Sequence, residues 1–404
     1  MSRLRIAWLS YRPPFPPLKG DQRVTTEQIR RLADIYSDEI ELHLLSLHRT
    51  EAERVAVEQN LGHCFTSMHW FKMSKLAHWA GLLRTPFNKA PMQVNYYTSE
   101  KNRREIRRTL ARLVPDMIHT QTVRTGLYIP PEIPLTLDML DLLSLNMRRR
   151  AEGERFPRRQ IFSLEAALLR RYEETMYKRA GVTMLVSEKD KIAWGKPDVV
   201  VNPNGTFITP EYLARYSNVE RKNAFVFHGG MSYFPNVQAA LFLANEIWPA
   251  VHRVLPDWRL LIVGNNPSPE IRRLHGRSNI EVTGFVPDIT ETLCGCRIGA
   301  YPLLAGTGML NKVLESMSVG IPLVATSRAM QGFPDREGDE ALERDTAQAF
   351  GEAMVRLAKD EALRKKIGES GQRYAWSKYS WENNVGNLVD CWRQGVVSRE
   401  TLGE

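Results

Sequence analysis

The stretch from 299 to 326, GAYPLLAGTGMLNKVLESMSVGIPLVAT, constrains the fold of this chain more than any other part of it. Its pattern predicts a buried strand over Ile298–Leu303, a glycine-rich loop, a helix over Met309–Val319 and a second buried strand over Leu323–Ala325. A strand, a loop, a helix and a further strand form the repeating unit of parallel α/β sheets. We therefore expect an α/β protein.

The same stretch carries a candidate binding site. Gly306 and Gly308 let a backbone approach a ligand closely, and the helix that follows presents unsatisfied N–H groups to an anion. Lys312 adds a positive charge, and Glu315, three residues later on the same helix face, adds an acceptor for sugar hydroxyls. Together they predict a nucleotide-sugar site. The alternative is an ordinary glycine-rich turn with a Lys/Glu pair facing solvent, and these residues alone leave both open.

Length and composition bound the class of protein. A chain of 404 residues is expected to form two domains of about 200 residues each. The net charge of +9 favours an anionic partner. We find no apolar run of about 18 residues and no secretory leader, so we expect no membrane span. The cysteines show no disulfide or metal spacing, which predicts reduced thiols and a cytoplasmic protein; they are Cys64, Cys294, Cys296 and Cys391.

Apolar runs alternate with helical patterns along most of the chain. The densest turn cluster lies over Lys196–Phe207 and separates two halves of similar pattern. We expect an N-terminal domain over residues 1–200, a second domain over 201–380, and a last helix over 381–404 that packs back toward the first domain. Each half would be a Rossmann-like domain, and the two would face each other across a cleft.

The second half places glycine after several predicted strands. The strand Ala224–His228 runs into Gly229 and Gly230, the segment LLIVG ends at Gly264, and the segment VTGFVPDI contains Gly284. Ligands of open α/β sheets bind outside the carboxyl ends of the strands. These glycines are therefore predicted to line one binding edge.

The order of these segments resembles a known family. HGGMSYFPN, LLIVG, VTGFVPDI and the stretch from 299 to 326 are similar to the donor half of a GT-B glycosyltransferase of the retaining family-4 type, and to bacterial exopolysaccharide sugar transferases within it. The first half is similar more loosely, through the loop Pro16–Asp21, the strand end at His119 and the segment Leu137–Asp141. The resemblance covers nearly the whole chain.

The resemblance implies a role for individual residues. Asp21, His119 and Lys312 would take part in catalysis, and Asp138 and Asp141 would contact the acceptor. The residues implied in donor binding are Gly20 and Asp21 at the transferred sugar; Gly229 and Gly230 at the phosphates; Gly284, Phe285 and Val286 at the base; Gly306, Thr307, Gly308 and Met309 around the sugar and phosphate; Lys312 at the phosphate; and Glu315 at the ribose. For His119, Asp138 and Asp141, purely structural roles are the alternative. His119 can be a core residue, and Asp138 and Asp141 can cap a helix.

Some positions depart from the family pattern. Thr307 stands where a first glutamate is usual, and Gln121 stands where a second histidine is usual. Met231 and Asn236 occupy the neighbourhoods of the usual arginine and lysine. Neutralisation of the diphosphate would then depend on Lys312, with Lys19 or Arg23 as a second cation. The chain also has no Asp-x-Asp pair to hold a metal–diphosphate, so we expect a metal-independent enzyme without a cofactor.

Basic segments occur in the first half, at Lys101–Arg112 and Arg148–Arg171, and an apolar-plus-basic segment covers His69–Leu83. The last of these could lie in an anionic membrane interface or could be an ordinary solvated helix face.

The sequence thus predicts a glycosyltransferase, either free in the cytoplasm or peripheral on the inner face of the membrane. It would move a hexosyl unit from a UDP- or GDP-sugar to a lipid-linked saccharide in exopolysaccharide or surface polysaccharide synthesis. A non-catalytic GT-B partner subunit is the alternative, and a GT-B epimerase is a weaker one. A nucleic-acid-binding role is not expected, because no recognisable module accompanies the basic clusters.

Overall fold

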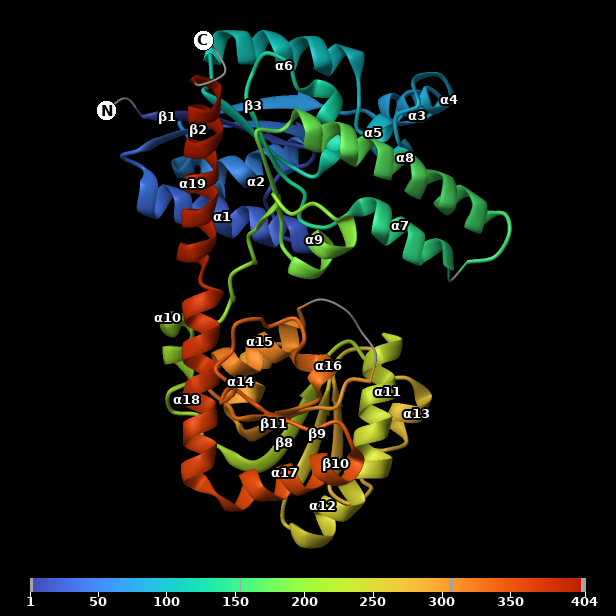
Figure 1. The fold of residues 1–404 in the computed structure, drawn as a ribbon, viewed down its shortest axis with the longest axis vertical. Coiled ribbons are helices and arrows are strands. Elements are labelled where there is room, and N and C mark those ends of the chain that lie inside the picture. Colours follow the sequence, from blue (N-terminus) through green and yellow to red (C-terminus); the bar gives the residue numbers. More distant parts are fainter. Residues whose placement is uncertain (1–2, 153, 305–308, 401–404) are drawn as a thin grey trace. The chain divides into compact units, whose positions relative to one another are not determined.

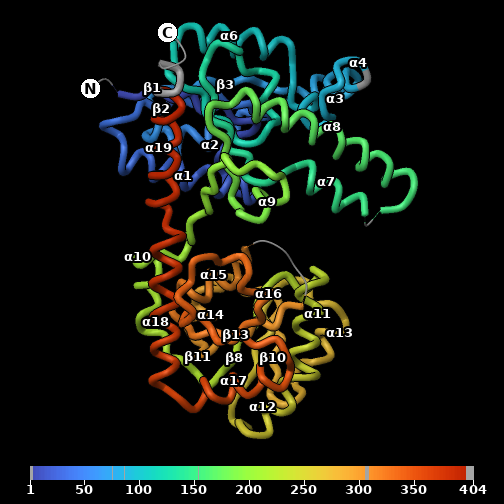
Figure 2. Tube along the Cα trace, viewed as in Figure 1, coloured from blue at the N-terminus to red at the C-terminus, as the bar shows by residue number. Residues whose placement is uncertain are grey.

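A computed structural model describes residues 3–152, 154–304 and 309–400 of the chain. It divides into two compact units (Figures 1 and 2), one formed by Met1–Asn204 with Trp381–Glu404 and the other by Gly205–Ser380. The chain leaves the first unit after Asn204 and returns to it at Trp381. Each unit is built on a parallel sheet of its own.

The sheet of the first unit has seven parallel strands among the described residues, in the order β3-β2-β1-β4-β5-β6-β7. Its central strands are continuous apolar runs because helices cover both faces of the sheet. The strands are β1 (Leu4–Ser10), β2 (Ile40–His48), β3 (Ser67–Lys72), β4 (Met117–Gln121), β5 (Leu135–Asp138), β6 (Val182–Leu185) and β7 (Val200–Val201).

Helices connect these strands and bury an apolar core on each face of the sheet. The helices are α1 (Gly20–Tyr36), α2 (Glu51–Leu61), η1 (Gly62–Cys64), α3 (Lys75–Leu82), α4 (Thr85–Asn88), α5 (Met92–Tyr96), α6 (Glu100–Leu113), η2 (Val123–Tyr128), α7 (Leu143–Glu152), α8 (Arg158–Arg179), α9 (Glu188–Trp194) and α19 (Trp381–Glu400).

The last helix, α19, completes the first unit (Figure 1). Its Val385, Leu388 and Trp392 are fully buried in the core that contains Trp8 of β1. Its first turns are tied by hydrogen bonds to the segment that leaves the unit: Asn384 Nδ2 donates to Pro203 O at 2.8 Å. The helix therefore supplies core residues that the rest of the first unit lacks.

The sheet of the second unit has six parallel strands among the described residues, in the order β10-β9-β8-β11-β12-β13. The strands are β8 (Lys222–His228), β9 (Arg259–Val263), β10 (Ile280–Gly284), β11 (Cys296–Tyr301), β12 (Leu323–Ala325) and β13 (Leu342–Glu343). The helices are α10 (Pro210–Leu213), η3 (Ala214–Tyr216), α11 (Phe234–Phe242), η4 (Leu243–Ile247), α12 (Trp248–Val254), α13 (Pro269–Arg272), α14 (Ile289–Cys294), α15 (Asn311–Ser318), α16 (Ser327–Met330), α17 (Ala347–Lys359) and α18 (Glu361–Lys378).

The predicted class is confirmed: both units are Rossmann-like, and the last helix packs on the first. One predicted boundary was wrong, because the helix predicted from Met309 begins at Asn311. The apolar-plus-basic segment His69–Leu83 is divided between strand β3, where Phe71 is buried, and helix α3.

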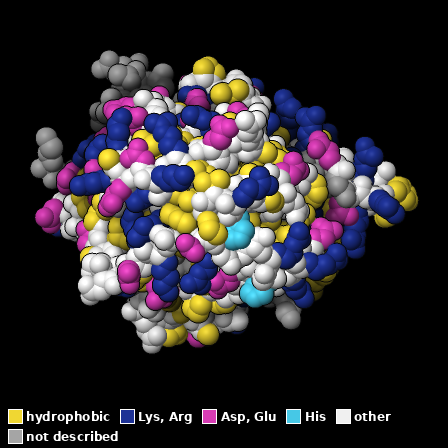
Figure 3. All heavy atoms as spheres, turned by 90° about the horizontal axis from the view of Figure 1, so that it is seen from below, with side chains coloured by type: hydrophobic (Ala, Val, Ile, Leu, Met, Phe, Trp, Pro, Cys, Tyr) yellow, Lys and Arg dark blue, Asp and Glu magenta, His cyan; other side chains and the backbone are white. Residues whose placement is uncertain are grey.

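The surface mixes charge and apolar groups. In the face that Figure 3 presents, side chains of both signs are spread among hydrophobic ones. Within the described part of the chain, no helix combines the length and the apolar character that crossing a membrane requires.

Candidate functional site

Three glycine turns lie side by side at the carboxyl edge of the second sheet. Gly229 N donates to Val263 O at 2.9 Å, and Gly264 N donates to Gly284 O at 3.0 Å. These bonds continue the strand pairing into the turns after β8, β9 and β10. A Cβ on Gly264 would lie 1.7 Å from Gly229 O, so the turns approach too closely for any side chain there.

Helix α15 brings a lysine to these turns. Lys312 Nζ donates to Asn236 Oδ1 on α11, and Asn236 Nδ2 donates in turn to Gly230 O at 2.9 Å. The amine lies 3.0 Å from the position that a Cβ on Gly229 would occupy. Burial lowers the pKa of Lys312 to about 8. A partly desolvated cation beside a glycine turn is suited to bind an anion.

Glu315 lies on the same helix and contacts a histidine at the end of β8. Its Oε2 is 2.9 Å from His228 Nε2, and His228 Nδ1 is 2.7 Å from the hydroxyl of Tyr301 at the end of β11. That hydroxyl is also 2.5 Å from Ser316 Oγ. The chain of contacts fixes the histidine ring and holds Glu315 in place through one of its two oxygens.

The other predicted donor residues have mixed outcomes. Gly229, Gly230, Lys312 and Glu315 come together as expected, and Gly284 lies on the same edge. Beyond Gly284, Phe285 is 74% exposed and Val286 packs partly against the core. Met309 is also half-buried against the core. The predicted contacts of Gly306, Thr307 and Gly308 lie outside the described residues.

Sequence reasoning assigned no role to His228 or Asn236. His228 is 87 residues from its partner Glu315, and Asn236 is 76 residues from Lys312, so no local pattern joins them. The available signal was positional: a polar side chain at a strand end and an Asn in the first turn of the next helix both fall at the carboxyl edge.

In the first unit, Asp21 lies in the first turn of α1 and is held by two residues after β1. Tyr11 Oη donates to Asp21 Oδ2 at 2.6 Å, and Arg12 Nε donates to the same oxygen at 2.8 Å. Gly20 precedes it, and a Cβ placed on Gly20 would meet no described atom within 4 Å. The loop therefore has open space at Gly20, while the Asp21 carboxylate is paired with Arg12.

A pocket of about 220 Å³ adjoins this loop, at the carboxyl ends of β1 and β2. Aromatic and basic side chains line much of it. Its lining includes Tyr11, Arg12, Leu18, Met73, His78 and Tyr97.

His119 is fully buried on β4. Its ring packs 4.2 Å from that of Trp8, and its Nδ1 accepts a hydrogen bond from Trp392 Nε1 at 3.3 Å. Burial lowers the pKa of His119 to about 3, so the ring is neutral at physiological pH. The geometry supports the core interpretation of this residue, and its catalytic role has no contact in its favour.

Asp138 and Asp141 differ in how far they are exposed to solvent. Asp138 is buried and accepts a hydrogen bond from Leu140 N at 3.1 Å, beside Gln121 and Gln28, and burial raises the pKa of Asp138 to about 6. Asp141 is exposed. Neither lines the pocket beside Asp21, so their acceptor role stays a prediction.

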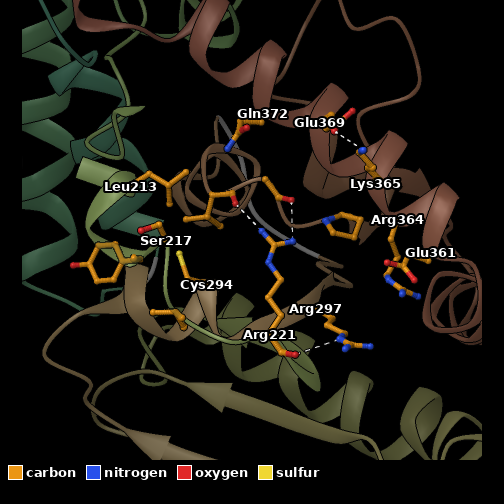
Figure 4. A pocket seen from close by; sticks show the side chains of 15 residues that line it. Leu213, Ser217, Arg221, Cys294, Arg297, Glu361, Arg364, Lys365, Glu369 and Gln372 are labelled. Carbon is orange, nitrogen blue, oxygen red and sulfur yellow. Dashed lines mark hydrogen bonds and ion pairs between the residues drawn. The ribbon is translucent and has the colours of Figure 1, made fainter. Parts of the chain in front are cut away.

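A larger pocket, of about 610 Å³, lies at the opposite, amino edge of the second sheet (Figure 4). Its polar groups bind the chain itself. Arg221 donates to Val319 O at 3.2 Å, and Gln372 Nε2 donates to Ser318 O at 3.0 Å. These bonds satisfy carbonyls at the end of α15. These hydrogen bonds thus hold the C-terminal end of α15, and Lys312 lies at the N-terminal end of the same helix.

Clusters of metal-ligating side chains were sought among the described residues. Across the ranges that the structure describes, no group of three or more His, Cys, Asp or Glu side chains could hold an ion. Metal independence remains an expectation.

Comparison with known proteins gives a match to one family model and to several solved structures. Residues 222–360 match the family model described as "Glycosyl transferases group 1". No curated protein sequence matches the chain. The fold is similar to three solved structures over almost their full length: HepE of Anabaena in complex with UDP (16% identity, TM-score 0.59, 96% of this chain and 99% of that one), sucrose-phosphate synthase of Thermosynechococcus elongatus (14%, 0.60, 98% and 100%) and a glycosyltransferase of Rickettsia africae (14%, 0.63, 98% and 99%).

The chain thus has the fold of GT-B proteins, and residues 222–360 of its second unit match a glycosyltransferase family model. The matched residues span β8 to the end of α17, the part of the second unit that contains Lys312, Glu315 and the glycine turns.

Proposed function

We propose that this enzyme is a retaining glycosyltransferase that moves a hexosyl unit from a UDP- or GDP-sugar to a lipid-linked saccharide, in the synthesis of a bacterial exopolysaccharide or surface polysaccharide. It would work at the cytoplasmic face of the membrane.

One observation carries the proposal: the partly desolvated Lys312 lies against the Gly229–Gly230 turn at the carboxyl edge of the second sheet. A diphosphate at this turn would receive backbone N–H groups and the Lys312 charge together. Because that charge is already desolvated, it acts more strongly on a developing anion than it would in water. It would stabilise the departing nucleoside diphosphate without a metal.

Glu315 is the proposed ribose ligand. Its Oε2 engages His228, and its Oε1 has no hydrogen-bond partner among the described residues. A ribose hydroxyl could donate to that second oxygen. The choice of UDP as a candidate nucleotide draws support from HepE, which is described in complexes with UDP and with UDP-glucose.

Transfer with retention needs no nucleophilic side chain. The acceptor oxygen forms its bond to the anomeric carbon on the face from which the diphosphate leaves. The bond from that carbon to the phosphate oxygen breaks, and the departing phosphate takes the acceptor proton. In this scheme the protein positions both substrates and stabilises charge.

The acceptor would bind in the first unit, at the pocket beside Asp21. The half-buried Tyr97 offers an aromatic ring to a sugar, and Arg12 offers a charged donor to a phosphate of the lipid carrier.

The test is a thermal-shift panel with UDP, GDP, ADP, TDP and CDP on the wild type, Glu315→Ala and Glu281→Ala. Glu281 is a control from the same unit, a half-exposed glutamate in an ion pair with Arg259 at 3.8 Å. A nucleotide at 100 times its Kd should stabilise the protein by about 2.7 kcal/mol. We expect one base to shift the wild type and the Glu281 variant but not the Glu315 variant.

A panel without any shift would overturn the donor site. A shift that Glu315→Ala retains would leave the site in place and remove Glu315 as the ribose ligand.

A non-catalytic GT-B subunit is a second candidate. The observation behind it is Gln121, which replaces a family histidine and is bound in a buried network with Thr25 and Gln28. This candidate predicts nucleotide binding without hydrolysis or transfer of the sugar, measured as release of free nucleotide.

A further inference from the structure

Helix α3 of the first unit has its apolar stripe on the outside. Its inner face packs on α5, where the His78 ring stacks on Tyr96 at 4.2 Å and a Cβ on Gly81 would lie 2.0 Å from Asn95 O. The opposite face presents Leu76 and Trp79, which are 79% and 67% exposed. The helix is therefore packed through its polar and small residues and leaves its large apolar residues uncovered.

The exposed residues form one continuous stripe. Leu76, Trp79 and Leu83 follow a spacing of three and four residues, which places them on one side of a helix. Phe87 on α4 extends the set, and it is 86% exposed while Leu83 is 75% exposed. We call these four residues the apolar tip. A patch of large apolar side chains on a soluble protein marks a site of interaction.

The surroundings of the tip are strongly basic. Residues 72–112 contain ten Lys and Arg against two Asp and Glu, a net charge of +8 out of +9 for the whole chain. Arg84, at the start of α4, lies 3.5 Å from Glu100 at the start of α6, so the two segments adjoin. The exposed basic residues of α6, which we call the basic helix face, are Lys101, Arg104, Arg107, Arg108 and Arg112.

We propose that the apolar tip and the basic helix face bind an anionic lipid bilayer. Apolar side chains would enter the boundary between headgroups and acyl chains, and Lys and Arg would attract the anionic headgroups. A second copy of this chain fits less well, because joining two tips would bring together two regions of charge +8.

The location of the tip agrees with a lipid-linked acceptor. Met73 and His78, at the base of α3, also line the pocket of about 220 Å³ beside Asp21, and Leu18 at the same pocket is 83% exposed. A bilayer bound at the tip would thus lie next to this pocket. This link rests on the proposed function, whereas binding of the bilayer does not require turnover.

The test is co-sedimentation of the full chain with vesicles of phosphatidylcholine alone or mixed equally with phosphatidylglycerol. We expect binding to the mixed vesicles to be at least about tenfold tighter, and to weaken with added salt. Leu76→Ser/Phe87→Ser should reduce it by about tenfold or more. The control Ile192→Ser/Leu164→Ser changes two other exposed apolar residues of the same unit, 73% and 59% exposed, and should bind normally.

Charge is tested separately with Arg104→Glu/Arg108→Glu, which should abolish the preference for anionic vesicles. Arg273→Glu/Arg277→Glu makes the same change in net charge on exposed residues of the second unit and should keep that preference. Equal losses in the test and control variants would overturn the proposal. So would a dimer that depends on the tip while vesicles are not bound.

The nucleotide panel distinguishes this result from the proposed function. Tip variants that lose the vesicles should keep the nucleotide shift of the wild type. Vesicle binding without any nucleotide shift would leave the bilayer surface standing and remove the donor site.

Discussion

At the scale of single residues, the surrounding structure changes the charge state of Lys312, which affects the binding of an anion. Burial lowers its pKa to about 8, so the free protein loses this positive charge as the pH rises through about 8. A diphosphate is already ionised over that range. Protonated Lys312 binds it better, and the affinity should therefore fall with rising pH.

We expect nucleotide affinity to drop by up to about tenfold between about pH 7 and pH 9 in the wild type, because one unit above a pKa only about a tenth of the amines stay protonated. Calorimetric titration at the two pH values measures this. Lys312→Arg should bind with little pH dependence, and Lys312→Met should bind weakly at both. A wild-type affinity that is flat over this range would contradict the assignment.

At the scale of elements, the contact between the turns after β8 and β9 is the tightest feature of the donor edge. Gly264→Ala would place a methyl group 1.7 Å from Gly229 O. Neither atom can rotate away, because the backbone fixes the position of the Cβ and the oxygen is itself a backbone atom. Gly276→Ala is the matched control, because its φ is also positive, +80°, but its Cβ would meet nothing within 4 Å.

The control should cost about 1 kcal/mol for its backbone conformation. Gly264→Ala should cost about 3 kcal/mol or more and should also displace Gly229 from Lys312. Thermal unfolding and the nucleotide shift measure the two effects. Equal destabilisation by both substitutions would show that the close approach of the turns is unimportant.

The elements also show what a sequence can and cannot predict. The strand Leu323–Ala325 was predicted to the residue, because a strand buried on both faces is a compact apolar run. Strand β3 was missed. It pairs on one side only, and its sequence SMHWFK mixes polar and apolar residues without a clear period.

The candidate site also contains residues that the sequence predicts and residues that it does not. Lys312 and Glu315 were predicted from their spacing on one helix. Their partners Asn236 and His228 were not, because those contacts depend on how the strands are ordered in the sheet.

At the scale of the whole molecule, the two units differ in how the chain builds them. The second is a single segment, Gly205–Ser380, whereas the first needs both Met1–Asn204 and Trp381–Glu404. We expect the fragment 205–380 to fold alone and to show the nucleotide shift of the full chain.

A chain that ends at Ser380 should retain the folded second unit and lose the first. It would lack Val385, Leu388 and Trp392, and the core around Trp8 would be open to water. Loss of several large buried side chains exceeds what a marginally stable domain tolerates. Limited proteolysis followed by mass spectrometry would show which part survives, and survival of an intact 1–204 segment would refute this expectation.

The position of α19 in the sequence, after the second unit, affects the order in which the two units can fold during synthesis. The face of the first sheet that carries Ile6 and Trp8 is synthesised before the second unit, whereas its covering helix is synthesised after it. At cellular rates of synthesis, the intervening segment takes roughly 10–35 s to be added. During that interval the second unit can finish folding while the core of the first remains exposed, so the first unit is completed after the second.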